Sequence, residues 1–310
     1  MNDSLSPALL TSLVFGAALL ANLLVKFWLA SRQIRAVARH RGAVPTEFAQ
    51  TITLASHQRA ADYTVAKLRL GLLELAFGGA VLLGWTLMGG LDWLNALLLQ
   101  AFGPGHPLLQ PLALLVAFAV INGLIDLPFG LYQTFVVEQR FGFNKMSLGL
   151  WLGDLLKGTL VGAAIGIPLA ALVLWLMGAT GRWWWLWTWA VWMGFSLLMM
   201  VIYPMFIAPL FNKFQPLADE ALKERVTGLM ARCGFAAKGL FVMDGSRRSA
   251  HANAYFTGFG AAKRVVFFDT LLKQLSVPEV EAVLAHELGH FKRRHIAKRI
   301  AAMFSFSLAG

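Results

Sequence analysis

Five long apolar stretches constrain this chain more than any other feature of its sequence. A helix needs about 20 mainly apolar residues to cross a bilayer. Stretches of that length occupy residues 7–30, 68–90, 107–135, 155–177 and 183–206. Of the 310 residues, 58% are hydrophobic and 14% are charged, whereas about a quarter are charged in a soluble domain. The sequence predicts a mainly α fold, a polytopic transmembrane helical bundle over residues 1–207.

The formal net charge of +11 is spread unevenly over the segments between these stretches. Lys and Arg gather after the first, third and fifth stretches, while the N-terminus and the other loops carry one or none. Cytoplasmic loops are the ones enriched in Lys and Arg. We therefore expect the N-terminus outside and the region after the fifth span in the cytoplasm. We expect no nucleic acid as a partner, because no aromatic and basic binding motif accompanies the charge.

Residues 208–296 read as a small cytoplasmic α+β domain. The pattern predicts a helix over 219–232 that Gly234 stops, and a short strand over 240–243. Two apolar runs, 253–257 and 264–268, flank Gly258-Phe259-Gly260 and predict a hairpin. A further helix is predicted to begin at Ser276, with Glu279 completing a capping box and Pro278 in the first turn.

That last helix carries His286-Glu287-Leu288-Gly289-His290. Two histidines four residues apart on a helix project from nearly the same face and can bind one zinc ion. Glu287 lies next to that face and can reach a zinc-bound water as general base. The alternative is a helix with two exposed histidines by chance, but His and Glu are both scarce in this chain. For Gly289, either another backbone approaches closely or the glycine is merely tolerated.

A catalytic zinc ion needs three protein ligands and one open position. No Asp or Glu follows Glu287, and His295 is expected on the opposite side of a continuous helix. Asp244 and Asp269 remain as upstream candidates without further support. Residues 297–310 read as the start of a sixth span, and half a span is not a stable membrane element. We expect a chain truncated at its C-terminus, with the third ligand beyond residue 310.

Several separated motifs together resemble the type I CAAX prenyl endopeptidase family of membrane zinc proteases. They are HELGH (286–290), SRRSAHANAYF (246–256), KRVVFFDTL (263–271), IAPLFNKF (207–214) and FVVEQRFGFNK (135–145). The resemblance implies one zinc ion per chain, held by His286 and His290, with Glu287 as the catalytic glutamate. It also implies seven spans around a water-filled chamber and a third ligand, a glutamate, without a counterpart here.

The resemblance further implies that Asn253, Ala254 and Tyr255 border a substrate groove, and His251 of the same motif is a substrate-binding candidate. A protease generally binds its substrate as a strand added to a sheet edge, and the predicted hairpin could offer that edge. Alternatively, Tyr255 and Phe256 only pack the hairpin. Within the spans, Glu74 and Asp126, with Asn22 and Asn122, either line a polar cavity or pair to lock helices.

The function expected from these features is a zinc-dependent integral-membrane endopeptidase. Its partners would be the lipid bilayer and a peptide or protein substrate, prenylated or not, cut near its C-terminus as in eukaryotic family members. A bacterial inner membrane is the expected location, or the endoplasmic reticulum membrane in a eukaryote. Two alternatives stay open: an HtpX-like quality-control metalloprotease, and a non-catalytic membrane scaffold with an incomplete zinc site.

Overall fold

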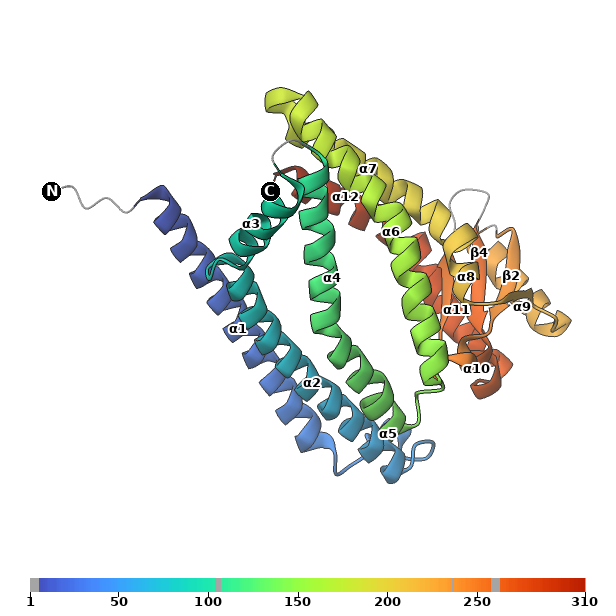
Figure 1. The fold of residues 1–310 in the computed structure, drawn as a ribbon. Coiled ribbons are helices and arrows are strands. Elements are labelled where there is room, and N and C mark those ends of the chain that lie inside the picture. The colour runs from blue at the N-terminus through green and yellow to red at the C-terminus, as the bar shows by residue number, and fades with distance from the viewer. Residues whose placement is uncertain (1–5, 104–106, 236, 258–262, 310) are drawn as a thin grey trace. The chain divides into compact units, whose positions relative to one another are not determined.

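The computed structural model describes residues 6–103, 107–235, 237–257 and 263–309. Most of these residues are helical, and a single small sheet lies in the C-terminal half (Figure 1). The chain divides into two compact units, Met1–Gly142 and Phe143–Gly310. The predicted fold class, a helical membrane bundle with a small α+β domain, is confirmed.

The first unit consists of long helices. Its elements are α1 (Pro7–His40), η1 (Thr46–Phe48), α2 (Leu54–Thr86), α3 (Gly90–Phe102), α4 (Leu109–Tyr132), η2 (Gln133–Glu138) and α5 (Gln139–Phe141). Ser6 and Thr53 cap α1 and α2 by accepting hydrogen bonds from backbone N–H groups of the first turn. Helices α1 and α2 pack side by side.

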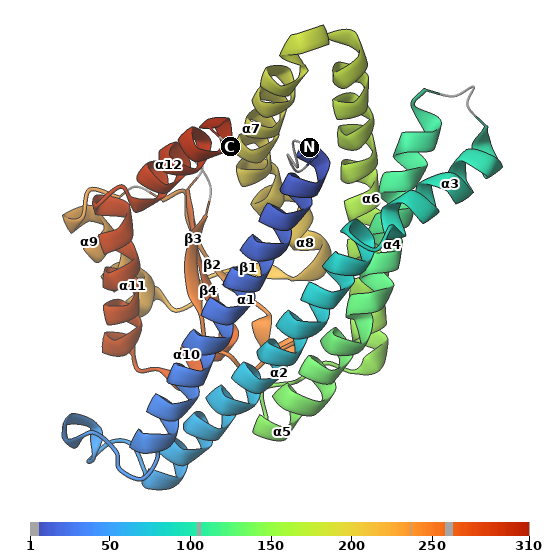
Figure 2. The same ribbon diagram turned by 90° about the vertical axis from the view of Figure 1, so that its left-hand side faces the viewer.

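The second unit joins two more long helices to the sheet. Its elements are α6 (Leu148–Ala179), η3 (Gly181–Trp183), α7 (Trp184–Ile202), η4 (Tyr203–Ile207), α8 (Ala208–Phe211), β1 (Phe214–Pro216), α9 (Glu220–Arg232), β2 (Gly239–Met243), η5 (Gly245–Arg247), β3 (Ala254–Thr257), β4 (Arg264–Phe268), α10 (Asp269–Gln274), α11 (Val277–Lys292) and α12 (His295–Ala309). Figure 2 shows α11 running beside the sheet. Helix α12 follows α11 and runs in a different direction from α11.

Within the described residues, five helices are long and apolar enough to cross a membrane. They are Pro7–His40, Leu54–Thr86, Leu109–Phe141, Leu148–Ala179 and Gly181–Phe211. The five predicted stretches lie almost entirely within these helices, which are longer because polar turns extend several of their ends. Helix α3 is not expected from the sequence, because it lies in the segment between the second and third apolar stretches. The domain boundary after residue 207 and the sixth span over 297–310 stay predictions.

The sheet has the strand order β1-β2-β4-β3. Strand β2 is antiparallel to β1 and parallel to β4, while β3 and β4 form the antiparallel hairpin expected from the sequence. Its turn, Gly258-Phe259-Gly260, lies outside the described residues. The predicted helix over 219–232 is also confirmed, with Asp219 as N-cap and Gly234 at a φ of +68° after its end.

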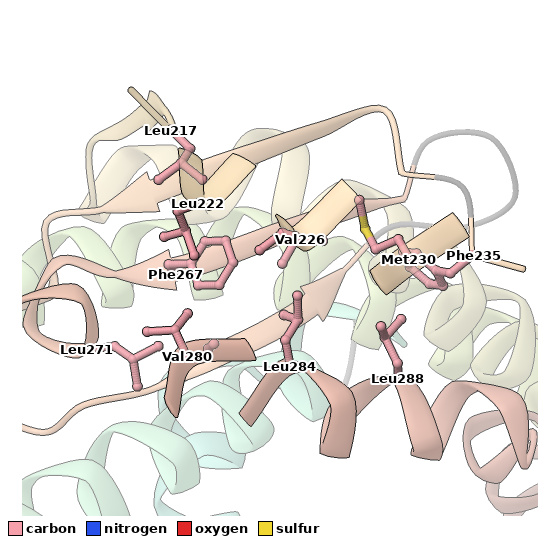
Figure 3. Close-up of a cluster of buried hydrophobic side chains, with 12 residues drawn as sticks. Leu217, Leu222, Val226, Met230, Phe235, Phe267, Leu271, Val280, Leu284 and Leu288 are labelled. Atoms are coloured by element: carbon pink, nitrogen blue, oxygen red, sulfur yellow. The ribbon is translucent and has the colours of Figure 1, made fainter. Parts of the chain in front are cut away.

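A compact hydrophobic core holds α9 and α11 against one face of the sheet. Figure 3 shows Val280, Leu284 and Leu288 of α11 facing Val226 and other side chains of α9 and β4. Leu284 and Leu288 have no solvent exposure. Burying a leucine side chain contributes about 1.5–3 kcal/mol. This ridge therefore fixes the rotation of α11 about its own axis.

Candidate functional site

Helix α11 begins as the sequence predicts. The Glu279 carboxylate accepts hydrogen bonds from the backbone N–H and the hydroxyl of Ser276, at 2.8 and 2.6 Å. These hydrogen bonds lower the pKa of Glu279. The ionised carboxylate also interacts favourably with the positive end of the helix dipole. The first turn of the motif helix is thus held in place at its N-terminus.

The buried ridge of α11 determines where the motif side chains lie. His286 and His290 are about 40° apart around a helix with 3.6 residues per turn, on a face away from Leu284 and Leu288. Both histidines are exposed, whereas Glu287 is half-buried between that face and the core. For Gly289, a Cβ would meet nothing within 4 Å among the described residues. Among the described residues, no other backbone segment comes close enough to Gly289 to require a glycine there.

The two histidine rings converge on one point. Their Nε2 atoms are 3.2 Å apart, with ring centroids separated by 4.9 Å and planes at 85°. Two nitrogens bound to one tetrahedral zinc ion at about 2.0–2.1 Å are about 3.3 Å apart. The side chains of His286 and His290 therefore fit a shared zinc ion.

No group of three or more His, Cys, Asp or Glu side chains placed to hold a metal ion occurs in the part of the chain that the structure describes. The upstream candidates have other partners. Asp244 accepts a hydrogen bond from the backbone N–H of Lys213 at 2.7 Å. Asp269 accepts hydrogen bonds from the backbone N–H and hydroxyl of Ser246. Burial by itself would raise the pKa of Asp269, but hydrogen bonds from Ser246 and Lys273 outweigh it and lower that pKa.

The expectation for His295 is wrong, because it assumed one continuous helix. Helix α11 ends at Lys292, and Arg294 takes a φ of +53°, in the left-handed region. This backbone turn brings the Nδ1 atom of His295 to 2.8 Å from Nδ1 of His290. His295 is thus adjacent to the pair of motif histidines.

Strand β3 is one of the two edge strands of the sheet and contacts α11. Ala254 is buried at its start. Burial, and then the neighbouring Tyr203, raise the pKa of Tyr255, so this phenol stays neutral. The Phe256 ring packs edge-on against the Phe235 ring, with 4.8 Å between the ring centroids. This contact supports the alternative that Phe256 packs the hairpin. Among the described residues β3 pairs only with β4, so its other edge has no neighbouring strand.

His251 and Asn253 hold the segment that leads into β3. The His251 ring stacks on the Phe143 ring, with 4.1 Å between the ring centroids. The backbone carbonyl of His251 accepts a hydrogen bond from the Thr270 hydroxyl. The Asn253 side chain accepts a hydrogen bond from the backbone N–H of Ala254. These contacts give both residues a structural role. Their role in substrate binding stays a prediction.

Arg248 is a residue of this region that sequence reasoning missed. Its guanidinium donates to both carboxylate oxygens of Asp154 in α6, at 2.8 and 3.0 Å, and to Asn212 at 3.0 Å. The two charged side chains are only 19% and 17% exposed. This bidentate pair links a membrane-length helix to the loop before β3. The sequence does contain a signal for this pair, because Asp154 adjoins an apolar stretch and an acidic side chain there generally requires a partner.

The first unit contains a cavity of about 510 Å³ that Glu74, Asp126 and Asn122 help to line. The Trp85 indole N–H donates to the Asn122 side chain at 3.2 Å. This agrees with the cavity-lining alternative for Glu74 and Asp126. Asn22 is not among the residues that line it.

Comparison with known proteins covers nearly the whole chain. Residues 33–213 match the family described as CAAX prenyl protease N-terminal, five membrane helices, and residues 216–310 match peptidase family M48. The chain is 43% identical to an Arabidopsis thaliana CAAX prenyl protease 1 homolog over 66% of its own length and 49% of that protein. It is 32% identical to the Homo sapiens homolog over 93% of its length and 70% of that protein.

The crystal structure of S. mikatae Ste24p is similar in fold, with a TM-score of 0.87 and 31% identity over 95% of this chain and 69% of that one. The chain spans about half the length of several curated relatives, namely 49%, 47% and 46% of the two plant proteins and the Saccharomyces cerevisiae protein.

Proposed function

We propose that this chain, which belongs to the CAAX prenyl protease family, forms the larger part of a zinc-dependent membrane endopeptidase. The observation that carries this proposal is the approach of His286 and His290, whose Nε2 atoms lie 3.2 Å apart on an exposed helix face. The described residues offer no group of three, and the proposed third ligand is a residue outside these 310. The matched segments make up only 49% and 46% of the Arabidopsis thaliana and Saccharomyces cerevisiae relatives, which leaves room for such a residue.

The chemistry follows from the residues of α11 and β3. Bound zinc would polarise the scissile carbonyl and lower the pKa of a water molecule. Glu287, next to both histidines, would accept a proton from the attacking water and donate it to the leaving amine. The open edge of β3 would bind the peptide in an extended conformation through backbone hydrogen bonds. His251, Asn253, Ala254 and Tyr255 would shape this edge.

The proposed substrates are peptides or proteins cut near their C-terminus, with or without a prenyl group. The support is indirect: several relatives are named CAAX prenyl proteases. The five membrane-length helices and the family match make the chain a multi-pass membrane protein. We propose that its N-terminus lies outside and the α11 region faces the cytoplasm, following the distribution of Lys and Arg.

The substrate class can be tested with the full-length protein in detergent or liposomes. A farnesylated peptide that ends in a cysteine followed by three residues is compared with the same peptide without the farnesyl group. We expect release of the last three residues from the farnesylated peptide, and faster cleavage of it than of the unmodified one. Equal rates would contradict recognition of the prenyl group. Cleavage of neither peptide, with cleavage of an unfolded membrane protein instead, would favour the quality-control alternative.

A further inference from the structure

The junction between α11 and α12 places a third histidine against the proposed metal ligands. His295 is the first residue of α12, and its Nδ1 atom lies 2.8 Å from Nδ1 of His290, with the rings tilted by 59°. On the other side of the His290 ring, Nε2 lies 3.2 Å from Nε2 of His286. Both ring nitrogens of His290 therefore have a histidine neighbour.

This arrangement depends on an unusual backbone conformation. Arg294 is the only non-glycine residue with a positive φ, +53°, among the described residues. A non-glycine residue in the left-handed region costs about 1 kcal/mol or more, and such strain often lies at functional sites. A continuous helix would have carried His295 away from His290. The strained residue is thus what brings the two rings together.

The chemistry of neutral imidazole gives the contact a direction. One nitrogen of each ring carries a proton, and only the other nitrogen has a lone pair for a metal ion. If Nδ1 of His290 donates its proton to Nδ1 of His295, then Nε2 of His290 keeps its lone pair and faces His286. The opposite direction would leave a proton on Nε2 of His290 and block metal binding there.

We propose that His295 is a positioning residue that accepts a hydrogen bond from His290, and so holds His290 in the tautomer and ring orientation that bind zinc. The proposal rests on the proposed function, because it concerns the same zinc ion. Metal-binding histidines commonly donate their second N–H to a fixed acceptor, and loss of that acceptor weakens metal affinity about 10- to 100-fold. His295 is not placed as a ligand itself, since it meets His290 on the nitrogen remote from His286.

The test measures the zinc dissociation constant of the full-length protein by competition with a chromogenic chelator. His295→Ala is expected to weaken zinc affinity about 10- to 100-fold. His295→Asn is expected to restore most of it, because the amide oxygen can accept the same hydrogen bond. Absence of zinc binding by the wild type would reject the proposed function itself. Wild-type binding with an unchanged constant in His295→Ala would reject only the role of His295.

A pair of substitutions at Arg294 separates this role from general destabilisation. Arg294→Gly keeps the left-handed conformation at low cost and should leave the zinc constant within about twofold of wild type. Arg294→Val disfavours that conformation, and should weaken zinc affinity as His295→Ala does.

Complete loss of zinc in His295→Ala without rescue by His295→Asn would mark His295 as a ligand and overturn the positioning role. Equal zinc dissociation constants for Arg294→Gly and Arg294→Val would also contradict the positioning role of His295.

Discussion

Replacing Glu287 by Gln should reduce the rate of peptide cleavage by about 100- to 10,000-fold, the usual contribution of a general acid and base. Gln has nearly the same shape as Glu, but its amide cannot accept a proton from water. Glu287 is half-buried beside the exposed histidines, and it is not proposed as a ligand. The zinc content of Glu287→Gln should therefore equal that of the wild type. The measurement is kcat on the peptide that the wild type cleaves, with zinc determined on the same sample.

A matched control for this variant is Glu281→Gln on the same helix. Glu281 lies near Arg225 and Arg232 on α9, at 3.8 and 3.2 Å, so it takes part in surface pairing. Its replacement should change stability by less than about 1 kcal/mol and leave kcat close to wild type. If Glu287→Gln retains wild-type kcat, or if both variants lose activity equally, Glu287 is not the base.

Replacing Arg248 by Met should destabilise the second unit by about 3 kcal/mol, because Asp154 would stay largely buried without its cation. For a unit of this size, that corresponds to a fall in Tm of roughly 6–12 °C. Adding Asp154→Leu to Arg248→Met should restore most of the lost stability. Removing both charges of a buried pair is often nearly neutral for stability. Thermal unfolding in detergent, followed for the four proteins of this double-mutant cycle, measures the coupling.

The exposed pair of Arg41 and Asp62 provides the comparison for this cycle. Its side chains are 44% and 47% exposed, against 19% and 17% for Arg248 and Asp154. Arg41→Met should therefore lower Tm by much less than Arg248→Met does. An equal Tm shift for Arg41→Met and Arg248→Met would show that the buried pair does not anchor the loop before β3.

Features that depend on local sequence were predictable from it. The apolar stretches predict the membrane-length helices, because length and hydropathy alone decide whether a helix can span a bilayer. Ser276 and Glu279 lie only three residues apart, so their capping box predicts the start of α11. The motif helix and the β3–β4 hairpin follow from similarly short patterns.

Features that depend on distant residues were not predictable. Arg248 and Asp154 are 94 residues apart, and no local pattern pairs them. Strand β1 has only three residues and becomes a strand only by pairing with β2. The break before α12 falls at Arg294, a residue type that gives no sign of a left-handed backbone. The adjacency of His290 and His295 was missed for this last reason.

The zinc content of the full-length protein, purified without added metal and measured by mass spectrometry, tests whether His286 and His290 bind zinc. We expect one zinc ion per chain in the wild type, the same content in Glu287→Gln, and nearly none in His286→Ala and His290→Ala. Removal of zinc with a chelator should abolish cleavage, and added zinc should restore it. Wild-type protein that cleaves peptides with no stoichiometric zinc, or histidine variants that keep a full zinc ion, would contradict the assignment of His286 and His290 as ligands.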